Sequence, residues 1–238
     1  MDYNIKIFKV KEAYDKFDFH DKPLHIFCCD EFSFQCDCED EAKVVFNRNS
    51  SAINLENFIA STFSCSNATG DYLPVLVIYK GKDILSNWRK KGPSTAFYDK
   101  NETGWIEGEQ FVRWFKLVFL KHCETLDGHK ILFIEDKASY ITLELIELAR
   151  DNNVILFRLP SHASHSLKQL NLDVFKLVKE SWPAIFKEFL EANFYKNLTK
   201  ENFSAFIKVL AECGFKKEMT VEGFKEKGLL PLNEEKMA

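Results

Sequence analysis

The chain of 238 residues lacks the features that mark several broad classes of protein. It has no apolar stretch of the roughly 20 residues that a membrane-spanning helix needs. The longest run, near Tyr72–Tyr79, is interrupted by Pro74. The N-terminal residues lack the apolar segment of a secretory signal peptide, and no internal repeat or Gly-, Pro- or Ser-rich linker divides the chain. These absences argue against a membrane protein, a secreted protein and a string of small domains.

An excess of positive charge is also missing. Lys and Arg number 32 against 36 Asp and Glu, which gives a net charge of −4. A nucleic-acid partner would therefore have to be held by a local basic patch. The 7 Cys are an odd number in a chain without a secretory signal, so we expect reduced thiols inside the cell. Phe is abundant, with 23 residues, and we attribute this excess to the core.

Apolar patterning predicts a mixed five-stranded α/β sheet flanked by helices. Strands are expected at residues 24–29, 59–66, 73–79, 130–134 and 154–157. The second and third form a hairpin about the turn at Asn67–Asp71. Helix, strand, helix, strand and helix follow, which predicts an antiparallel meander joined to parallel strands by crossovers. The last of these helices is expected to kink or break at Pro183.

The pattern divides the chain into three parts. Residues 1–23 are polar and weakly patterned, and we expect a lead-in segment there. Residues 24–195 should form the main domain. Residues 196–238 should form a helical C-terminal extension of the same domain, with Thr199 as the N-cap of a helix.

Two of the predicted strands end in carboxylates. Asp30 follows the first strand and Asp136 follows the fourth. Ligands gather at strand ends in open α/β sheets, so the two carboxylates would approach each other if these strands are neighbours. Paired carboxylates repel unless a divalent cation compensates, and oxygen ligands suit Mg²⁺ or Mn²⁺. The alternative is that each acid simply begins a turn.

A polar segment after the fifth strand holds further candidates. His162 and His165 could be metal ligands, although an isolated H-x-x-H pattern also suits a hydrogen-bonded loop. Asn171 and Asp173 lie at the start of the next helix.

Four segments in a fixed order carry a family resemblance. They are Ser61–Lys82, Gly104–Trp114, Pro160–His165 with the form P-x-H-x-x-H, and Gly223–Asn233 with the form G-x-x-P-x-N near its end. Together they resemble the DDE-superfamily endonuclease domain of pogo-, jerky- and tigger-like transposases, from about Leu24 to the C-terminus. The resemblance implies an RNase H-like fold, DNA as the partner and a nuclear location. It also implies three acids that hold two Mg²⁺ or Mn²⁺ ions for phosphodiester cleavage and strand transfer.

The first two acids of the family fall on acids of this chain. The family's D-E-T-G motif falls on Asp30–Ser33, where the acid is kept and the small residues are lost. Glu31 is adjacent to Asp30 on a strand, so it should point to the opposite face of the sheet. The D-x-x-S-H motif begins at Asp136, with Ser139 retained and Tyr140 in place of the His.

The third acid is missing. The family's Q-P-L-D motif falls on residues 168–171 and ends on Asn171. An amide oxygen can touch a metal but adds no negative charge. Asp173 could substitute only if the segment stays extended, because two residues on a helix lie about 200° apart. We therefore expect a catalytically degenerate domain, with Mg²⁺ or Mn²⁺ as the cofactor if it is active and no cofactor otherwise. The alternatives are a live nuclease that uses Asp30, Asp136 and Asp173, and a protein-interaction or homo-oligomerisation module without a nucleic-acid role.

Two basic clusters could contact phosphates. They contain Lys80 and Lys82, and Arg89, Lys90 and Lys91. Ordinary charged surface is the other interpretation. The residues before the first strand leave no room for the helix-turn-helix DNA-binding part of the family, so an autonomous transposase is not expected.

Overall fold

A mixed sheet lies at the centre of the fold. The computed structural model of the protein describes residues 3–36, 43–45, 58–135, 140–159, 174–194 and 198–237. Its 7-stranded sheet has the spatial order β5-β4-β3-β1-β6-β7, and β2 pairs with β1. The strands are β1 (Ile26–Cys36), β2 (Lys43–Val45), β3 (Phe58–Asn67), β4 (Leu76–Lys80), β5 (Phe97–Asn101), β6 (Lys130–Glu135) and β7 (Val154–Leu159).

The strand directions gather most carboxyl ends at one edge of the sheet. β3 runs antiparallel to both β1 and β4. β6 and β7 run parallel to β1, and β5 runs parallel to β4. The carboxyl ends of β1, β4, β5, β6 and β7 therefore share an edge. This is the RNase H-like arrangement that the sequence predicted, with all five expected strands present.

The structure has strand residues in three places where the sequence analysis predicted none. β2 and β5 were not predicted, and β5 pairs its backbone with the outer side of β4. The first strand does not end at Asp30, because β1 continues to Cys36 by pairing with β3 along its whole length. These are long-range pairings of backbone groups, which a local apolar pattern does not encode.

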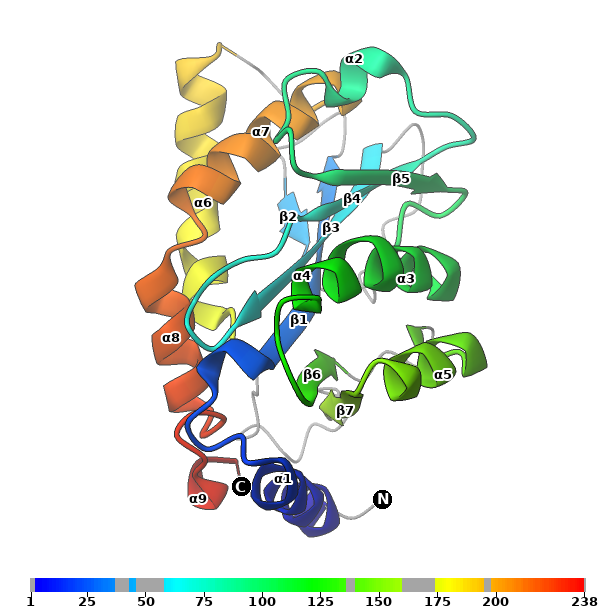
Figure 1. Ribbon diagram of the computed structural model, residues 1–238. Coiled ribbons are helices and arrows are strands. Elements are labelled where there is room, and N and C mark those ends of the chain that lie inside the picture. The colour runs from blue at the N-terminus through cyan, green and yellow to red at the C-terminus, as the bar shows by residue number, and fades with distance from the viewer. Residues whose placement is uncertain are drawn as a thin grey trace.

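Helices cover both faces of the sheet (Figure 1). On one face lie α3 (Gly108–Trp114), the π-helical η2 (Phe115–Leu120), α4 (Lys121–Cys123) and α5 (Leu143–Asp151). On the other lie α6 (Lys176–Ala192), α7 (Lys200–Cys213) and α8 (Lys217–Glu226). The short elements are η1 (Pro23–His25), α2 (Ser86–Arg89) and α9 (Glu234–Met237). Of the predicted kink or break at Pro183, the break is wrong, because the helix α6 is continuous through this residue.

The strand β1 separates two apolar cores by alternation. Ile26, Cys28 and Phe32 belong to the core under α6 and α7. Phe27 and Cys29 belong to the core under α3 and α5. Successive side chains on a strand point to opposite faces, so this alternation fixes where the acids of β1 point.

The lead-in segment contains a helix that the sequence analysis did not predict. This helix, α1 (Tyr3–Phe17), buries Val10 and Tyr14. The Tyr14 hydroxyl donates a hydrogen bond of 2.7 Å to the Leu229 carbonyl, which is 215 residues away in the sequence. The N-terminal helix is therefore packed against the C-terminal extension, and α1 lies beside α9 in Figure 1.

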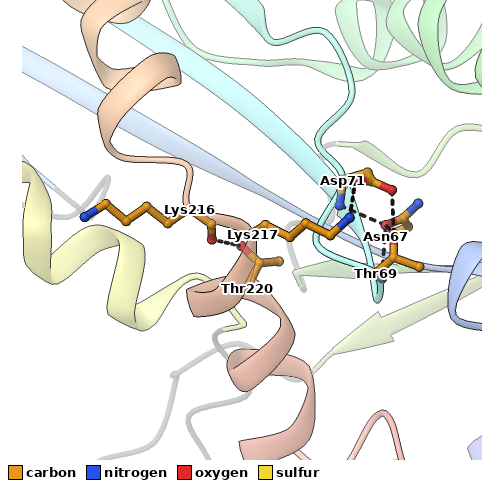
Figure 2. A network of polar contacts seen from close by, with 6 residues as sticks. All are labelled: Asn67, Thr69, Asp71, Lys216, Lys217 and Thr220. Carbon is orange, nitrogen blue, oxygen red and sulfur yellow. Dashed lines mark hydrogen bonds and ion pairs between the residues drawn. The ribbon is translucent and has the colours of Figure 1, made fainter.

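A network of polar contacts connects α8, in the C-terminal extension, to the turn that follows β3 (Figure 2). The predicted turn at Asn67–Asp71 is present: the Asp71 amide donates to Asn67 Oδ1 over 3.0 Å. The Lys217 ammonium of α8 donates to Asp71 Oδ1 over 2.9 Å, and the Thr69 hydroxyl lies 2.6 Å from Asp71 Oδ2. These hydrogen bonds from Thr69 and Lys217 lower the pKa of Asp71. Thr199 caps α7 as predicted, accepting a hydrogen bond from the Asn202 amide.

Candidate active site around Asp30

Asp30 lies on β1 at the point where the parallel pairing with β6 ends. Cys29 pairs with Ile134 of β6, and Asp30 is the next residue of β1. The two strands that were expected to bring Asp30 and Asp136 together are therefore neighbours. Asp30 is 8% exposed and faces α6, in step with Cys28 and Phe32. Its Oδ1 accepts a hydrogen bond of 2.7 Å from the Glu31 amide.

A lysine from α6 neutralises the Asp30 carboxylate. The ammonium of Lys179 lies 2.6 Å from Asp30 Oδ2, and the two side chains are 19% and 10% exposed. The same ammonium lies 5.0 Å from the centre of the Phe32 ring, a cation–π contact. Buried lysines are rare unless they are paired, so the ion pair explains how Lys179 is accommodated between β1 and α6.

Sequence reasoning missed Lys179, although the signal was present. Phe175, Trp182 and Phe186 form an apolar, buried stripe along α6. Lys179 stands four residues after Phe175 and three before Trp182, which places it on this stripe. A charged residue at a core-facing helical position predicts a buried partner.

Phe32 accounts for one departure from the family's D-E-T-G motif. Its ring is fully buried, 4.5 Å from the ring of Trp182 and 5.7 Å from that of Phe175. It fills the space beside Asp30 with aromatic packing. The large side chain that replaces a small residue at this position is therefore accommodated by the aromatic side chains of Phe175 and Trp182.

Glu31 points to the opposite face, as predicted. One oxygen of its carboxylate accepts a hydrogen bond of 2.8 Å from the Ile106 amide, and the other accepts one of 2.5 Å from the Tyr140 hydroxyl. Tyr140 is buried and stacks on Phe111 at 5.3 Å, with the rings 10° from parallel. The change from His to Tyr140 therefore belongs to the core beneath α3, and its hydroxyl serves Glu31. The change therefore does not count against a site on the Asp30 face.

The remaining candidates for the metal site lie outside the described residues. They are Asp136, Ser139, His162, His165, Asn171 and Asp173. Within the ranges that the structure describes, no three His, Cys, Asp or Glu side chains are grouped so as to hold a metal ion. Of the family's three ligand positions, Asp30 alone is described, and a lysine ammonium is already bonded to it. This geometry does not fit a divalent ion at Asp30, because the ion would lie beside a like charge.

The predicted phosphate-binding cations lie at and beyond the carboxyl end of β4. Lys80 ends β4, and Lys82, Arg89, Lys90 and Lys91 follow it; all five are exposed. We call these five residues the basic edge. The adjoining helix α7 adds Lys200, whose ammonium donates to the Lys80 carbonyl over 3.0 Å and lies 4.7 Å from the Trp88 ring. Through Ala60 of β3, Tyr79 is level with Phe34 of β1, so the basic edge lies beyond Asp30 in the direction of β1.

Solved structures of the Mos1 mariner transposase are similar to this chain at low sequence identity. A pre-cleavage Mos1 transpososome matches 92% of this chain and 60% of its own, with 10% identity and a TM-score of 0.44. The Mos1 catalytic domain with raltegravir and Mn matches 92% of this chain and 91% of its own, with 8% identity and a TM-score of 0.41.

Sequence comparison gives one relative and one family. The chain is 26% identical over 119 residues to a protein of Cochliobolus lunatus named MFS-type transporter clz9, a match that spans 49% of this chain and 13% of that protein. Among the described residues, no helix is long and apolar enough to cross a membrane. The sequence profile of the family described as DDE superfamily endonuclease matches residues 57–224, which is more than half of the chain. The protein therefore belongs to the DDE endonuclease superfamily.

Proposed function

We propose that the protein is a transposase-derived domain of the pogo, jerky and tigger kind that binds DNA without cleaving it. One combination of features carries the proposal: the basic edge presents five exposed cations beyond the carboxyl end of β4, while Asn171 stands where the third acid of the family is expected. The surface suited to a phosphate backbone is thus retained, and a charge needed for two metal ions is lost. DNA as the partner implies a nuclear location.

The basic edge has the charge that backbone contact requires. Lys82, Arg89, Lys90 and Lys91 form no ion pair with any residue in the described ranges. Their ammonium and guanidinium groups are therefore available to phosphates. The net charge of −4 means that binding would be local to this edge and would weaken steeply as salt rises.

The proposal is tested by the salt dependence of DNA binding. The variant Arg89→Gln/Lys90→Gln/Lys91→Gln should weaken binding of a short duplex and reduce the slope of log K against log salt by roughly 1 per cation that contacts a phosphate. Fluorescence anisotropy between low and moderate salt measures both quantities.

A matched control removes the same charge elsewhere. Lys9→Gln/Lys16→Gln/Lys225→Gln changes three exposed cations of α1 and α8, at the opposite end of the molecule from α2 (Figure 1). It should bind like the parent. Equal losses for the two triple variants, or no measurable affinity of the parent at low salt, would contradict binding at the basic edge and favour a protein-interaction role.

A further inference from the structure

We infer that Lys179 is a built-in cation that takes the place of a divalent ion at Asp30. The inference deepens the proposed loss of cleavage, since it assigns a residue that makes this site independent of metal. It does not depend on whether the domain binds DNA.

The position of Lys179 is set by the fold. The stripe formed by Phe175, Trp182 and Phe186 holds α6 against the sheet, and Lys179 lies within that stripe. Its side chain is therefore directed at β1, where its ammonium reaches Asp30 Oδ2 over 2.6 Å and Phe32 over 5.0 Å. An aromatic ring face and a carboxylate are the two environments that best receive a partly buried ammonium.

The charge of the site follows from this contact. A carboxylate that is only 10% exposed requires a compensating positive charge, and Lys179 supplies it from within the chain. The carboxylate oxygens of Asp30 already accept hydrogen bonds, Oδ1 from the Glu31 amide and Oδ2 from Lys179. A divalent ion would have to displace the ammonium or lie beside it against like-charge repulsion. The neutral Asn171 removes one of the charges that could offset that repulsion in the family's arrangement.

The experiment compares the response to Mn²⁺ of the parent and of Lys179→Met. Met has a similar length and no charge, so it preserves much of the packing. The parent should show no rise in melting temperature with millimolar MnCl₂. Lys179→Met should melt roughly 10 °C lower in EDTA, because Asp30 is left buried without its cation. Mn²⁺ should then raise its melting temperature, and titration followed by the electron paramagnetic resonance signal of free Mn²⁺ should show binding that the parent lacks.

Two controls separate charge from packing. Lys176→Met lies on the same helix, with a side chain 51% exposed and paired to Glu180, and it should behave like the parent with and without Mn²⁺. Asp30→Asn/Lys179→Met removes both charges, so it should recover most of the stability lost by Lys179→Met and should not respond to Mn²⁺. If Lys179→Met folds in neither condition, this neutral pair decides: recovery supports the inference, and failure to recover shows that Lys179 acts through packing.

Other outcomes overturn the inference. A parent that binds Mn²⁺ through Asp30, so that Asp30→Asn abolishes the binding, contradicts the role assigned to Lys179. A Lys179→Met variant that folds but gains no Mn²⁺ response contradicts it as well. If the parent shows no DNA binding at the basic edge, the proposed function is refuted and the Lys179 result is unchanged.

Discussion

The hydrogen bond between Tyr140 and Glu31 should have a measurable effect on stability. Glu31 is 6% exposed, and the Tyr140 hydroxyl donates to its Oε2 over 2.5 Å within an aromatic core. Tyr140→Phe keeps the ring that stacks on Phe111 and removes only the hydroxyl. Hydrogen bonds to a carboxylate contribute about 1.5–3 kcal/mol, and a buried acceptor that loses its donor lies toward the upper end of that range.

The measurement is urea unfolding followed by tryptophan fluorescence. Tyr140→Phe should lower the free energy of unfolding by about 2–3 kcal/mol with an unchanged slope in urea. Tyr140→His, which restores the family residue, should lose at least as much, because the shorter imidazole ring does not fill the space of the phenol beside Phe111. Tyr98→Phe is the control: its hydroxyl donates to the Pro93 carbonyl over a long 3.4 Å, so its removal should change the free energy by at most about 0.5 kcal/mol. If Tyr140→Phe is as stable as the parent, the Tyr140 hydroxyl does not stabilise the buried Glu31 carboxylate, and the role assigned to it is wrong.

Two further predictions concern the turn that binds α8. Gly70→Ala should destabilise the fold by roughly 1–3 kcal/mol in thermal unfolding, since Gly70 has φ 83° and an added Cβ would lie 2.5 Å from the Lys217 carbonyl oxygen; a neutral effect would contradict the close approach. Asp71 has a pKa lowered by Thr69 and Lys217, so its contribution should be complete above about pH 4 and lost as pH falls through the lowered value. Because Asp71 is half exposed, the difference in unfolding free energy between the parent and Asp71→Asn should be below about 1 kcal/mol at neutral pH and should vanish in acid.

The local pattern of apolar and turn-forming residues was sufficient to predict much of the fold. Apolar runs located the five predicted strands, and the turn at Asn67–Asp71 followed from residues that form turns. Strand alternation alone placed Asp30 and Glu31 on opposite faces, which the structure confirms through their different partners.

The missing parts depend on contacts between distant segments. The helix α1 has a weak apolar pattern and is stabilised by the C-terminal extension, as the bond from Tyr14 to Leu229 shows. The continuation of β1 past Asp30 depends on pairing with β3. The pair of Asp30 and Lys179 joins residues 149 positions apart, so the motif could identify the acid but could not supply its partner.

The proposal that DNA is bound but not cut is tested most directly by nicking of supercoiled plasmid in the presence of Mn²⁺. The parent should leave the plasmid intact at protein concentrations that bind it, because Asn171 adds no charge and Asp30 is neutralised by Lys179. Asp30→Ala is the control for contaminating nucleases, and Asn171→Asp tests whether the third acid alone restores cleavage. Nicking by the parent that disappears in Asp30→Ala would show a working metal site served by Asn171 or Asp173, and would contradict the proposed function.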